Sequence, residues 1–243
     1  MIKKLHRTNR NKELFMVHIY GIQIKTFSNK KLLYSLMKLV SKNKRERIKK
    51  FMFQQDSLRC LFGALLSRYA ICKISNYKND ELKFNVNSYN KPFLIKPNSL
   101  YFNTSHSGRW VVCAVANNPV GIDVEYIKSI DFDIAKTFFT KEEYINLMNQ
   151  DIKNQKRYFY LMWTLKESYV KADGRGLSLP LNSFSIDIKN DEISIITNNK
   201  LNLCYFKKYY IDNLHISSVC SLSNNFCSEI NEVTVYDLLE TLS

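Results

Sequence analysis

The spacing of hydrophobic and polar residues predicts strands and helices in two successive stretches of the chain. In the first stretch, an apolar and β-prone run over 15–24 predicts a strand, and a helical hairpin is expected after it. The charged run 44–50 belongs to this hairpin. Apolar residues then recur at helical spacing, which predicts a core helix, at Leu58, Leu61, Phe62, Leu65, Leu66 and Tyr69.

A polar segment rich in turn-forming residues follows this core helix. Residues 85–99 contain two prolines and are expected to form turns, and residues 101–109 are expected to form a loop. The apolar run 110–116 between this loop and the turn at 117–119 predicts a buried strand.

The second stretch begins with an apolar strand over 120–125 and continues with helices over 135–149 and 158–171. Alternating strands follow, and they are expected over 184–188, 192–196, 203–211 and 215–221. The two stretches resemble each other weakly, because the glycine-containing strand and the helix of the first recur about a hundred residues later. A duplicated unit and a chance match explain this likeness equally well, since glycine within an apolar strand is common.

Composition indicates a folded, basic protein. Hydrophobic residues make up 45% and charged residues 24%, which is close to the globular average. The 36 Lys and Arg against 22 Asp and Glu give a net charge of +14, which attracts polyanions such as nucleic acid, acidic membranes, phosphorylated ligands or acidic proteins. Because the chain is also rich in Lys, Asn and Ile, as AT-rich coding produces, the charge alone names no partner.

The cysteines and the absence of long apolar runs predict a cytoplasmic location. The six cysteines show neither a CxxC pair nor zinc-ligand spacing, which is typical of reduced thiols. The apolar run 14–19 is too short for a signal sequence, and no run has the length of a membrane span.

Two acidic residues lie two positions apart in the predicted strand 120–125. In an extended chain Asp123 and Glu125 point to the same face, roughly 7 Å apart along the backbone. Two close carboxylates repel unless a cation lies between them, and oxygen ligands of this kind suit Mg²⁺. The alternative is that one carboxylate is capped by backbone while the other is solvated.

The helix predicted over 158–171 carries a second carboxylate site. Trp163, Glu167 and Lys171 recur at every fourth position and therefore share one face. An ordinary surface ion pair of Glu167 with Lys171 explains two of them. It does not explain the glycine-rich run 174–181 after the helix, which indicates backbone held close to another group.

The segment 104–109 combines hydroxyls, an imidazole, a guanidinium and glycine. Ser105, His106 and Arg109 in one loop are the groups that a phosphate cradle uses, and a plain polar turn would contain them equally well.

Four motifs in this order resemble the signature of the Sfp-type 4′-phosphopantetheinyl transferases. They are NTSHSG at 103–108, VGIDVE at 120–125, WxxKESxxK at 163–171 and GRGLSLP at 174–180. KRER at 44–47, NKP at 90–92 and FFTKEEY at 138–144 are also similar to that family. The resemblance covers residues 15–222.

The resemblance implies an α+β fold that is a pseudo-dimer of two similar α+β halves, with the active site in the cleft between them. The halves would be residues 15–118 and 119–243. A basic N-terminal extension, residues 1–14, has no counterpart in the resemblance and is expected to be disordered.

The resemblance also implies the reaction. Such an enzyme transfers the 4′-phosphopantetheine group of coenzyme A to a serine of an apo acyl or peptidyl carrier protein and releases adenosine 3′,5′-bisphosphate. Asp123, Glu125 and Glu167 would bind Mg²⁺, which bridges the pyrophosphate. Glu167, or a water that it or the metal positions, would be the base, and Lys171 would stabilise the developing negative charge.

Further residues would bind coenzyme A as the co-substrate. Ser105 and His106 would contact the phosphates, and Pro92 would lie against the adenine. Lys44, Arg47 and Lys91 would recognise the 3′-phosphate and the adenosine. Cys60 stands at a helix position near the ligand where the family often has threonine or another small residue, which leaves that contact open.

The implied partners are coenzyme A and an acidic carrier protein, with no nucleic acid and no membrane, and a fused pseudo-dimer could act as a monomer. The carrier would dock on 126–137, where Ile127, Ile130 and Phe132 either contact it or pack into the core. Two other classes compete. A nucleic-acid-binding module is favoured by the basic and aromatic run 205–210 but lacks any known recognition motif, and a Mg²⁺ nuclease accounts for the carboxylates but not for the SHSG and GRGLSLP segments.

Overall fold

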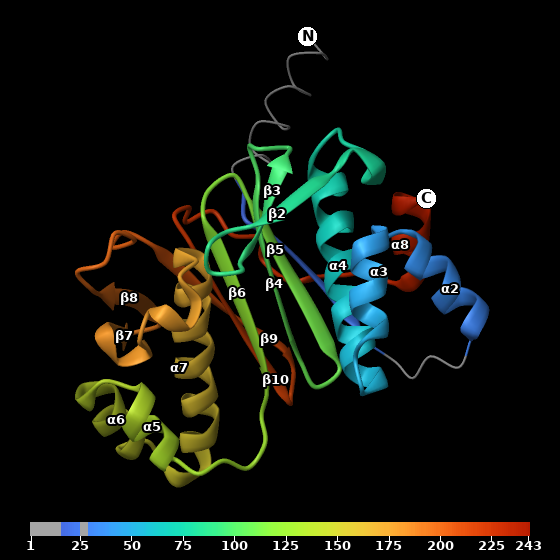
Figure 1. Cartoon of the computed structure of the whole chain (residues 1–243). Helices are drawn as coiled ribbons and strands as arrows, with labels where there is room; N and C mark the ends of the chain where they lie inside the picture. The colour runs from blue at the N-terminus through green and yellow to red at the C-terminus, as the bar shows by residue number, and fades with distance from the viewer. Residues whose placement is uncertain (1–15, 25–28) are drawn as a thin grey trace.

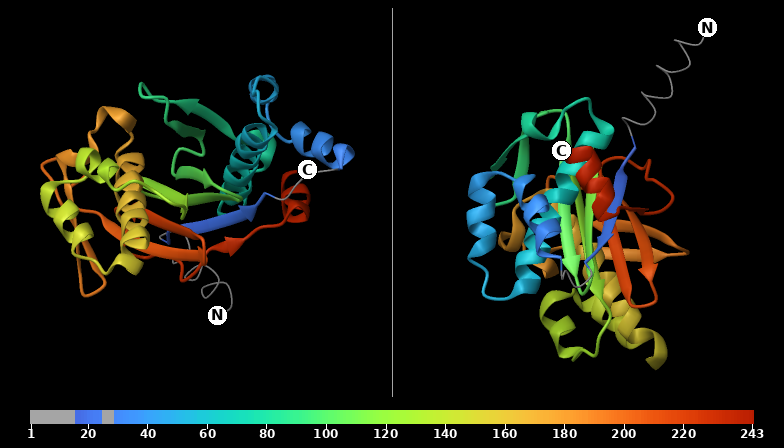
Figure 2. Two further views of the ribbon diagram at one scale, coloured as in Figure 1. Left: turned by 90° about the horizontal axis from the view of Figure 1, so that it is seen from below. Right: turned by 90° about the vertical axis from the view of Figure 1, so that its right-hand side faces the viewer.

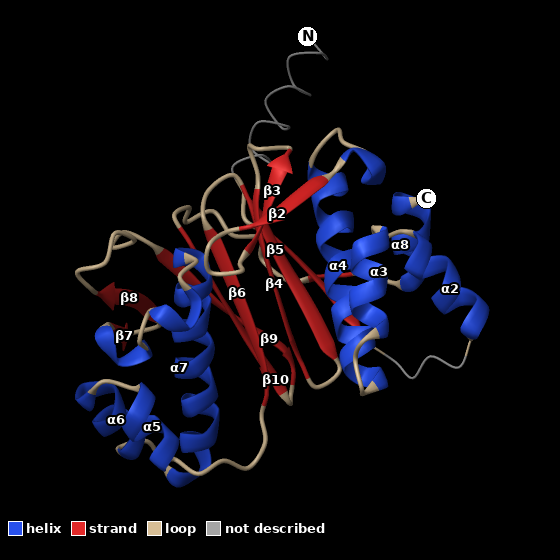
Figure 3. Cartoon of the chain, viewed as in Figure 1, coloured by secondary structure: helices blue, strands red, loops and turns tan. Residues whose placement is uncertain are grey.

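The computed structural model describes residues 16–24 and 29–243, with strands at the centre and helices outside (Figure 3). The helices form two groups on opposite sides of the central strands (Figure 1). One group is α2 (Lys30–Lys38), α3 (Lys42–Lys49), α4 (Gln54–Ile74) and α8 (Val235–Leu242), and the other is α5 (Asp133–Phe138), α6 (Lys141–Met148) and α7 (Ile152–Asp173). Three short 3₁₀ turns lie at Asn79–Glu81, Gly176–Ser178 and Leu181–Ser183.

The central strands form two sheets. The first has the order β11 (Asn231–Glu232), β1 (His18–Gln23), β5 (Trp110–Ala116) and β4 (Tyr101–Ser107), and only the β1–β11 pair is parallel. The second sheet is antiparallel, with the order β6 (Val120–Tyr126), β10 (His215–Ser221) and β9 (Tyr205–Asp212). Two separate hairpins are β2 (Lys83–Val86) with β3 (Pro92–Lys96) and β7 (Ser185–Lys189) with β8 (Glu192–Ile196).

Each sheet packs against one long helix, and the two sheets also pack together. Phe62 and Leu65 of α4 lie in a core with the first sheet, and Phe159 and Leu165 of α7 lie in a second core. A third apolar cluster joins the sheets, with Val17, Ile19, Val112, Ala114 and Ala116 from the first and Val120, Ile122, Val124, Tyr209 and Val219 from the second. The predicted α+β class and its arrangement in two halves are confirmed.

Local sequence explains where the helices begin and end. Ser41 accepts a hydrogen bond from the amide of Lys44 and caps α3. Thr140 and Glu143 form a capping box at the start of α6, which interrupts the single helix predicted over 135–149. Gly174 ends α7 with φ 88°, a left-handed conformation that glycine adopts without a steric cost.

The segment 231–242 returns to the first half. β11 pairs with β1, and α8 packs against α4 through Leu238 and Leu242. Figure 2 shows α8 beside the N-terminal helices and away from α7. The structure therefore differs from the predicted assignment of all residues of 119–243 to one half. The predicted extension 1–14 lies outside the described residues.

Two further segments differ from the sequence-based expectations. The turn-rich segment 85–99 includes the end of β2 and all of β3, which form a hairpin, and the expected loop 101–109 is mostly strand β4. Strand β3 is exposed at every position except Leu94, and β4 consists mostly of polar residues after Phe102, so neither shows the regular apolar alternation that identifies a strand. No helix within residues 16–24 and 29–243 is both long and apolar enough to cross a membrane.

Candidate active site

The edges of the two sheets meet at β4 and β6, where side chains of β4 reach the backbone and side chains of β6. The side-chain oxygen of Asn103 accepts a hydrogen bond from the amide of Ile122 (2.9 Å). Ser107 Oγ accepts one from the amide of Tyr126 (3.0 Å) and donates one to Glu125 Oε2 (2.7 Å). Alternate residues of a strand share a face, and the polar alternation of NTSHSG therefore joins the two halves.

Asp123 is the centre of this junction. Its Oδ1 accepts hydrogen bonds from Ser105 Oγ (2.8 Å) and from Lys171 Nζ (2.6 Å), and Lys171 Nζ also lies 3.0 Å from Ser105 Oγ. Asp123 is 3% exposed, and its Oδ2 is buried without a hydrogen-bond partner among the described residues. A buried carboxylate oxygen without a donor is costly unless a further positive group reaches it.

Glu125 and Glu167 lie close enough to Asp123 to be affected by its charge. Burial and then the charge of Asp123 raise the pKa of Glu125 above its ordinary value. Burial and then Asp123 also raise the pKa of Glu167. Both shifts have the cause expected where several carboxylates gather in a site shielded from water.

Helix α7 reaches this junction because β6 carries a glycine. A Cβ on Gly121 would lie 2.0 Å from the carbonyl oxygen of Ser168 and 2.3 Å from the amide of Ala172, so only glycine permits this approach. Trp163, Glu167 and Lys171 share the half-buried face of α7, as predicted from their spacing. Trp163 packs against the rings of Phe138 and Phe159, 5.5 and 5.8 Å away.

The carboxylates have the chemistry of a site for a hard cation. They offer oxygen ligands only, which Mg²⁺ prefers, and Asp123 Oδ2 is available to bind one. Within the described residues, no three His, Cys, Asp or Glu side chains converge in a ready-made metal site, and Lys171 is the cation that contacts Asp123. The donor atoms therefore fit Mg²⁺, although their present arrangement is centred on Lys171.

A basic cleft of about 650 Å³ lies in the first half, beside β4. Lys44, Arg47, Pro92 and His106, all predicted from the resemblance, line it, as does Cys60. Neither Lys44 nor Arg47 forms an ion pair with another described residue, so both charges are available to a ligand. The remaining lining residues are Ser41, Asn43, Phe51, Asp56, Arg59, Gly63, Ala64, Ser67, Arg68, Phe84, Asn85, Val86, Phe102 and Thr104.

Sequence reasoning missed two arginines of α4 in this cleft. Arg59 donates hydrogen bonds to Asp56 and to the carbonyl of Gly108 (3.1 and 3.0 Å), and Arg68 binds Asn79 and lies over the ring of Phe84. The sequence contains a signal for them. Between the apolar positions of α4, polar or small residues recur at Asp56, Arg59, Cys60, Gly63 and Ser67, which at helical spacing form the face toward the cleft.

His106 and Ser105 lie on opposite faces of β4. His106 lines the cleft, where desolvation and then the charge of Arg59 lower its pKa. Ser105 is 8% exposed and is bonded to Asp123 and Lys171. The predicted phosphate contact of His106 has a suitable position, and that of Ser105 would require its hydroxyl to leave Asp123.

Lys91 does not line the cleft. Its ammonium donates hydrogen bonds to the backbone carbonyls of Lys171, of Ala172 (3.3 Å) and of Val120 (3.4 Å). Burial lowers the pKa of Lys91 to about 8. The structure gives this side chain a contact with α7 and β6, and its recognition of a 3′-phosphate stays a prediction.

Other candidate surfaces are used within the fold. Ile127, Ile130 and Phe132 are half-buried against the core around α7, as the alternative to carrier docking predicted. In the basic and aromatic run of β9, Tyr209 is buried and Lys207 donates to the carbonyl of Cys227. This is the pattern of a half-buried edge strand.

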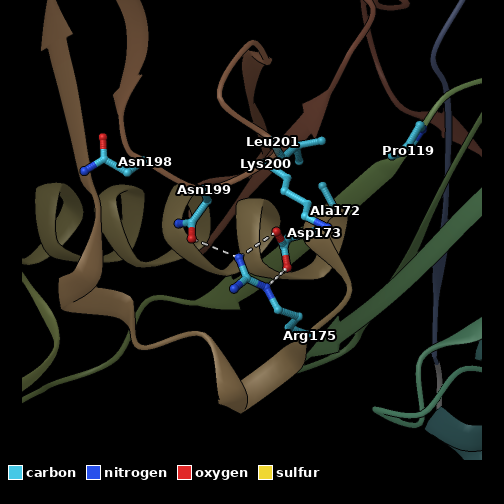
Figure 4. Close-up of a pocket in the computed structure, with 8 residues that line it drawn as sticks. All are labelled: Pro119, Ala172, Asp173, Arg175, Asn198, Asn199, Lys200 and Leu201. Carbon is cyan, nitrogen blue, oxygen red and sulfur yellow. Dashed lines mark hydrogen bonds and ion pairs between the residues drawn. The ribbon is translucent and has the colours of Figure 1, made fainter.

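A second pocket, of about 630 Å³, lies at the C-terminal end of α7 (Figure 4). Arg175 donates to both carboxylate oxygens of Asp173 (2.6 and 3.0 Å) and to Asn199 (3.0 Å). These three side chains hydrogen-bond to one another and hold the turn that follows Gly174. The pocket is lined by Pro119, Ala172, Asp173, Arg175, Asn198, Asn199, Lys200 and Leu201.

Comparison with known proteins identifies the family of the chain. The 4′-phosphopantetheinyl transferase superfamily matches residues 119–220, and the 4′-phosphopantetheinyl transferase N-terminal family matches residues 28–118. The chain is 37% identical to the 4′-phosphopantetheinyl transferase Sfp of Bacillus subtilis strain 168, over 91% of this chain and 99% of that protein. It is 38% identical to the 4′-phosphopantetheinyl transferase gsp of Aneurinibacillus migulanus, over 76% of this chain and 77% of that protein. The chain belongs to the 4′-phosphopantetheinyl transferase family of enzymes.

Proposed function

We propose that this enzyme uses Mg²⁺ and coenzyme A to place a 4′-phosphopantetheine group on a serine of an apo acyl or peptidyl carrier protein. The leaving product is adenosine 3′,5′-bisphosphate. One observation carries the proposal. Asp123, Lys171 and Ser105 form a partly buried, hydrogen-bonded cluster at β4, and the cleft beside the same strand holds Lys44 and Arg47, which have no ion-pair partner among the described residues.

The cleft supports binding of the nucleotide end of coenzyme A. Lys44 and Arg47 suit a phosphate dianion, because charge-assisted hydrogen bonds from free cations are stronger than neutral ones. Pro92 and the ring of Phe51 offer an apolar surface to the adenine. His106 at the same cleft would contact the phosphates, and Ser105 would do so after releasing Asp123.

Asp123, Glu125 and Glu167 would bind Mg²⁺ through oxygen atoms. The partnerless Oδ2 of Asp123 is the observation that supports this assignment. When bound, the ion supplies positive charge to the pyrophosphate oxygens and orients them for displacement. The two positive charges of the ion and the charge of Lys171 would then balance the three carboxylates.

The nucleophile is the serine hydroxyl of the carrier, which attacks the β-phosphorus of coenzyme A. The bond from this phosphorus to the oxygen shared with the α-phosphate breaks at the same time. No covalent intermediate forms on this chain. Glu167, or a water that it holds, takes the proton of the hydroxyl. Lys171 already lies against Asp123 and Ser105 and stabilises the negative charge on the bridging oxygen as the adenosine bisphosphate leaves.

The surface charge and the domain arrangement support the remaining assignments. A net charge of +14 favours encounter with an acidic carrier and makes it sensitive to salt. Both halves of the site come from one chain, so a monomer in the cytoplasm suffices, without a nucleic acid or membrane partner. The carrier would approach over 126–137.

Intact mass spectrometry of an apo carrier tests the proposal. Incubation with coenzyme A and Mg²⁺ should add one phosphopantetheinyl group, about 340 Da from its composition, and EDTA should prevent the addition. The apo acyl and peptidyl carriers are tried in parallel. Unchanged carrier masses together with no binding of coenzyme A would refute the assignment.

A further inference from the structure

Lys91 joins the first half to the C-terminal end of α7. It lies in the loop between β2 and β3, and its ammonium is bonded to the carbonyls of Lys171 and Ala172 in α7 and of Val120 in β6. A lysine ammonium has three hydrogens, and here three carbonyls accept them. Within the described residues Lys91 forms no ion pair with a carboxylate.

The position of these carbonyls explains why a cation is suitable there. The last carbonyls of a helix have no partner within the helix and carry the negative end of its dipole. A lysine ammonium satisfies both needs. Asn87 of the same loop adds a neighbouring contact, since its Nδ2 donates to the carbonyl of Gly174 (3.0 Å).

The loop that holds Lys91 is itself fixed in shape. Asn87 Oδ1 accepts hydrogen bonds from the amides of Tyr89 and Lys91 (2.9 Å each), and the amide of Asn87 donates to the carbonyl of Lys91 (2.9 Å). The loop is therefore a hydrogen-bonded connection of fixed shape between the β2–β3 hairpin and α7. On the other side of the same turn, Arg175 is held by Asp173 and Asn199 (Figure 4).

The two groups that this contact connects belong to the reaction. Pro92, which follows Lys91, lines the cleft. Lys171, whose carbonyl Lys91 binds, directs its side chain to Asp123 and Ser105. We propose that Lys91 is a positioning residue that sets the distance between the nucleotide cleft and the Lys171–Asp123 cluster. This inference rests on the proposed function and differs from direct recognition of the 3′-phosphate by Lys91.

Steady-state kinetics distinguish a positioning role of Lys91 from direct recognition of the 3′-phosphate. Replacement of Lys91 by methionine nearly keeps the length of the side chain and removes the hydrogen-bond donors of the ammonium. It should lower kcat about 10- to 100-fold, the effect of a small misplacement of reacting groups. The loss should be the same with coenzyme A and with 3′-dephospho-coenzyme A. The ratio of their KM values should stay within about twofold of the wild-type ratio.

Arg47→Met is the matched control, because Arg47 lines the cleft and has no ion-pair partner among the described residues. It should raise KM for coenzyme A and reduce the preference over the dephospho compound. Lys91→Arg, which keeps the charge and donors, should recover part of kcat. The inference would be overturned if Lys91→Met kept the wild-type kcat but, like Arg47→Met, lost the preference for coenzyme A over the dephospho compound. That result would leave the proposed transferase activity intact.

Hydrogen exchange gives a readout without turnover. In Lys91→Met the amides of the last turn of α7 should exchange at least about tenfold faster than in the wild type, while those of α4 stay unchanged. Unchanged exchange in this turn would also overturn the inference. If Lys91→Met does not fold, Asn87→Ala is measured in the same two assays. It removes the contact with Gly174 and the two side-chain hydrogen bonds that fix the loop, keeps the Lys91 ammonium, and should show a smaller loss of kcat.

Discussion

Ser105 and Asp123 come from different halves of the molecule, and the hydroxyl of Ser105 donates a hydrogen bond of 2.8 Å to Oδ1 of Asp123. Lys171 completes the contact from α7. Neither sheet alone holds the complete cluster. The site therefore exists only when the two sheets pack together, and its geometry depends on every contact that fixes one half against the other.

Glu167→Gln should lower kcat about 10²- to 10³-fold, because the amide keeps the shape and removes the charge. Its free energy of unfolding should not fall, since burial and Asp123 raise the pKa of Glu167 and so disfavour the charged form in the fold. Carrier labelling rates and urea denaturation measure the two effects. The exposed Glu142→Gln on α6 is the control, and equal rates for both variants would contradict a role of Glu167 in the reaction.

Gly121→Ala should destabilise the protein by about 1–3 kcal/mol or more, because the new methyl group would overlap the backbone of α7 at Ser168 and Ala172. Gly63→Ala in α4 provides a matched comparison. Its Cβ would meet no atom within 4 Å, and alanine is favoured over glycine in a helix by about 1 kcal/mol. Denaturation curves should therefore shift in opposite directions for the two variants.

Lys166→Met should cost about 3–5 kcal/mol of unfolding free energy, since it leaves Glu143 charged and buried without its ion-pair partner. Lys166 Nζ lies 2.7 Å from both carboxylate oxygens of Glu143, and the two side chains are 0% and 2% exposed. Adding Glu143→Gln should recover part of the loss. The exposed Lys156→Met on the same helix should change stability by less than about 0.5 kcal/mol.

Asp212→Asn should make the stability of the protein less dependent on acid pH. Burial alone would raise the pKa of Asp212, but hydrogen bonds from His215, Trp110 and Arg109 outweigh it and hold the pKa well below its usual value. A lowered folded pKa stabilises the fold above the unfolded value of about 3.9, and this contribution is lost as pH falls further. The difference in unfolding free energy between wild type and variant, about 1–3 kcal/mol at neutral pH, should shrink below about pH 4. A constant difference from pH 2 to 7 would contradict this account.

The sequence predicted the elements with strong apolar patterns. Strands form over 192–196 and 215–221 as expected. Trp163, Glu167 and Lys171 share one face because residues four apart in a helix lie above one another. The strand β4 was expected to be a loop. Its alternating side chains are polar since they bond to a neighbouring strand rather than to an apolar core.

Long-range contacts could not be predicted from local pattern. Nothing near Lys91 in the sequence indicates that its ammonium binds the end of a helix 80 residues later. Likewise, the short strand β11 has too few residues for a periodic signal, and its pairing with β1 depends on tertiary structure. The cleft residues of α4 are an intermediate case. Their polar and small side chains can be placed on one face of the helix from the sequence, but the sequence does not show that this face lines a cleft.

The return of 231–242 to the first half bears on how the protein forms during synthesis. β1 lacks one neighbouring strand, and the core around α4 lacks Val233, Leu238 and Leu242, until these residues are available. Domains fold as units while the chain emerges, N-terminal first. Here the first strand of the described residues pairs with one of the last, so the first half can complete its sheet and its core only after residues 231–242 have left the ribosome.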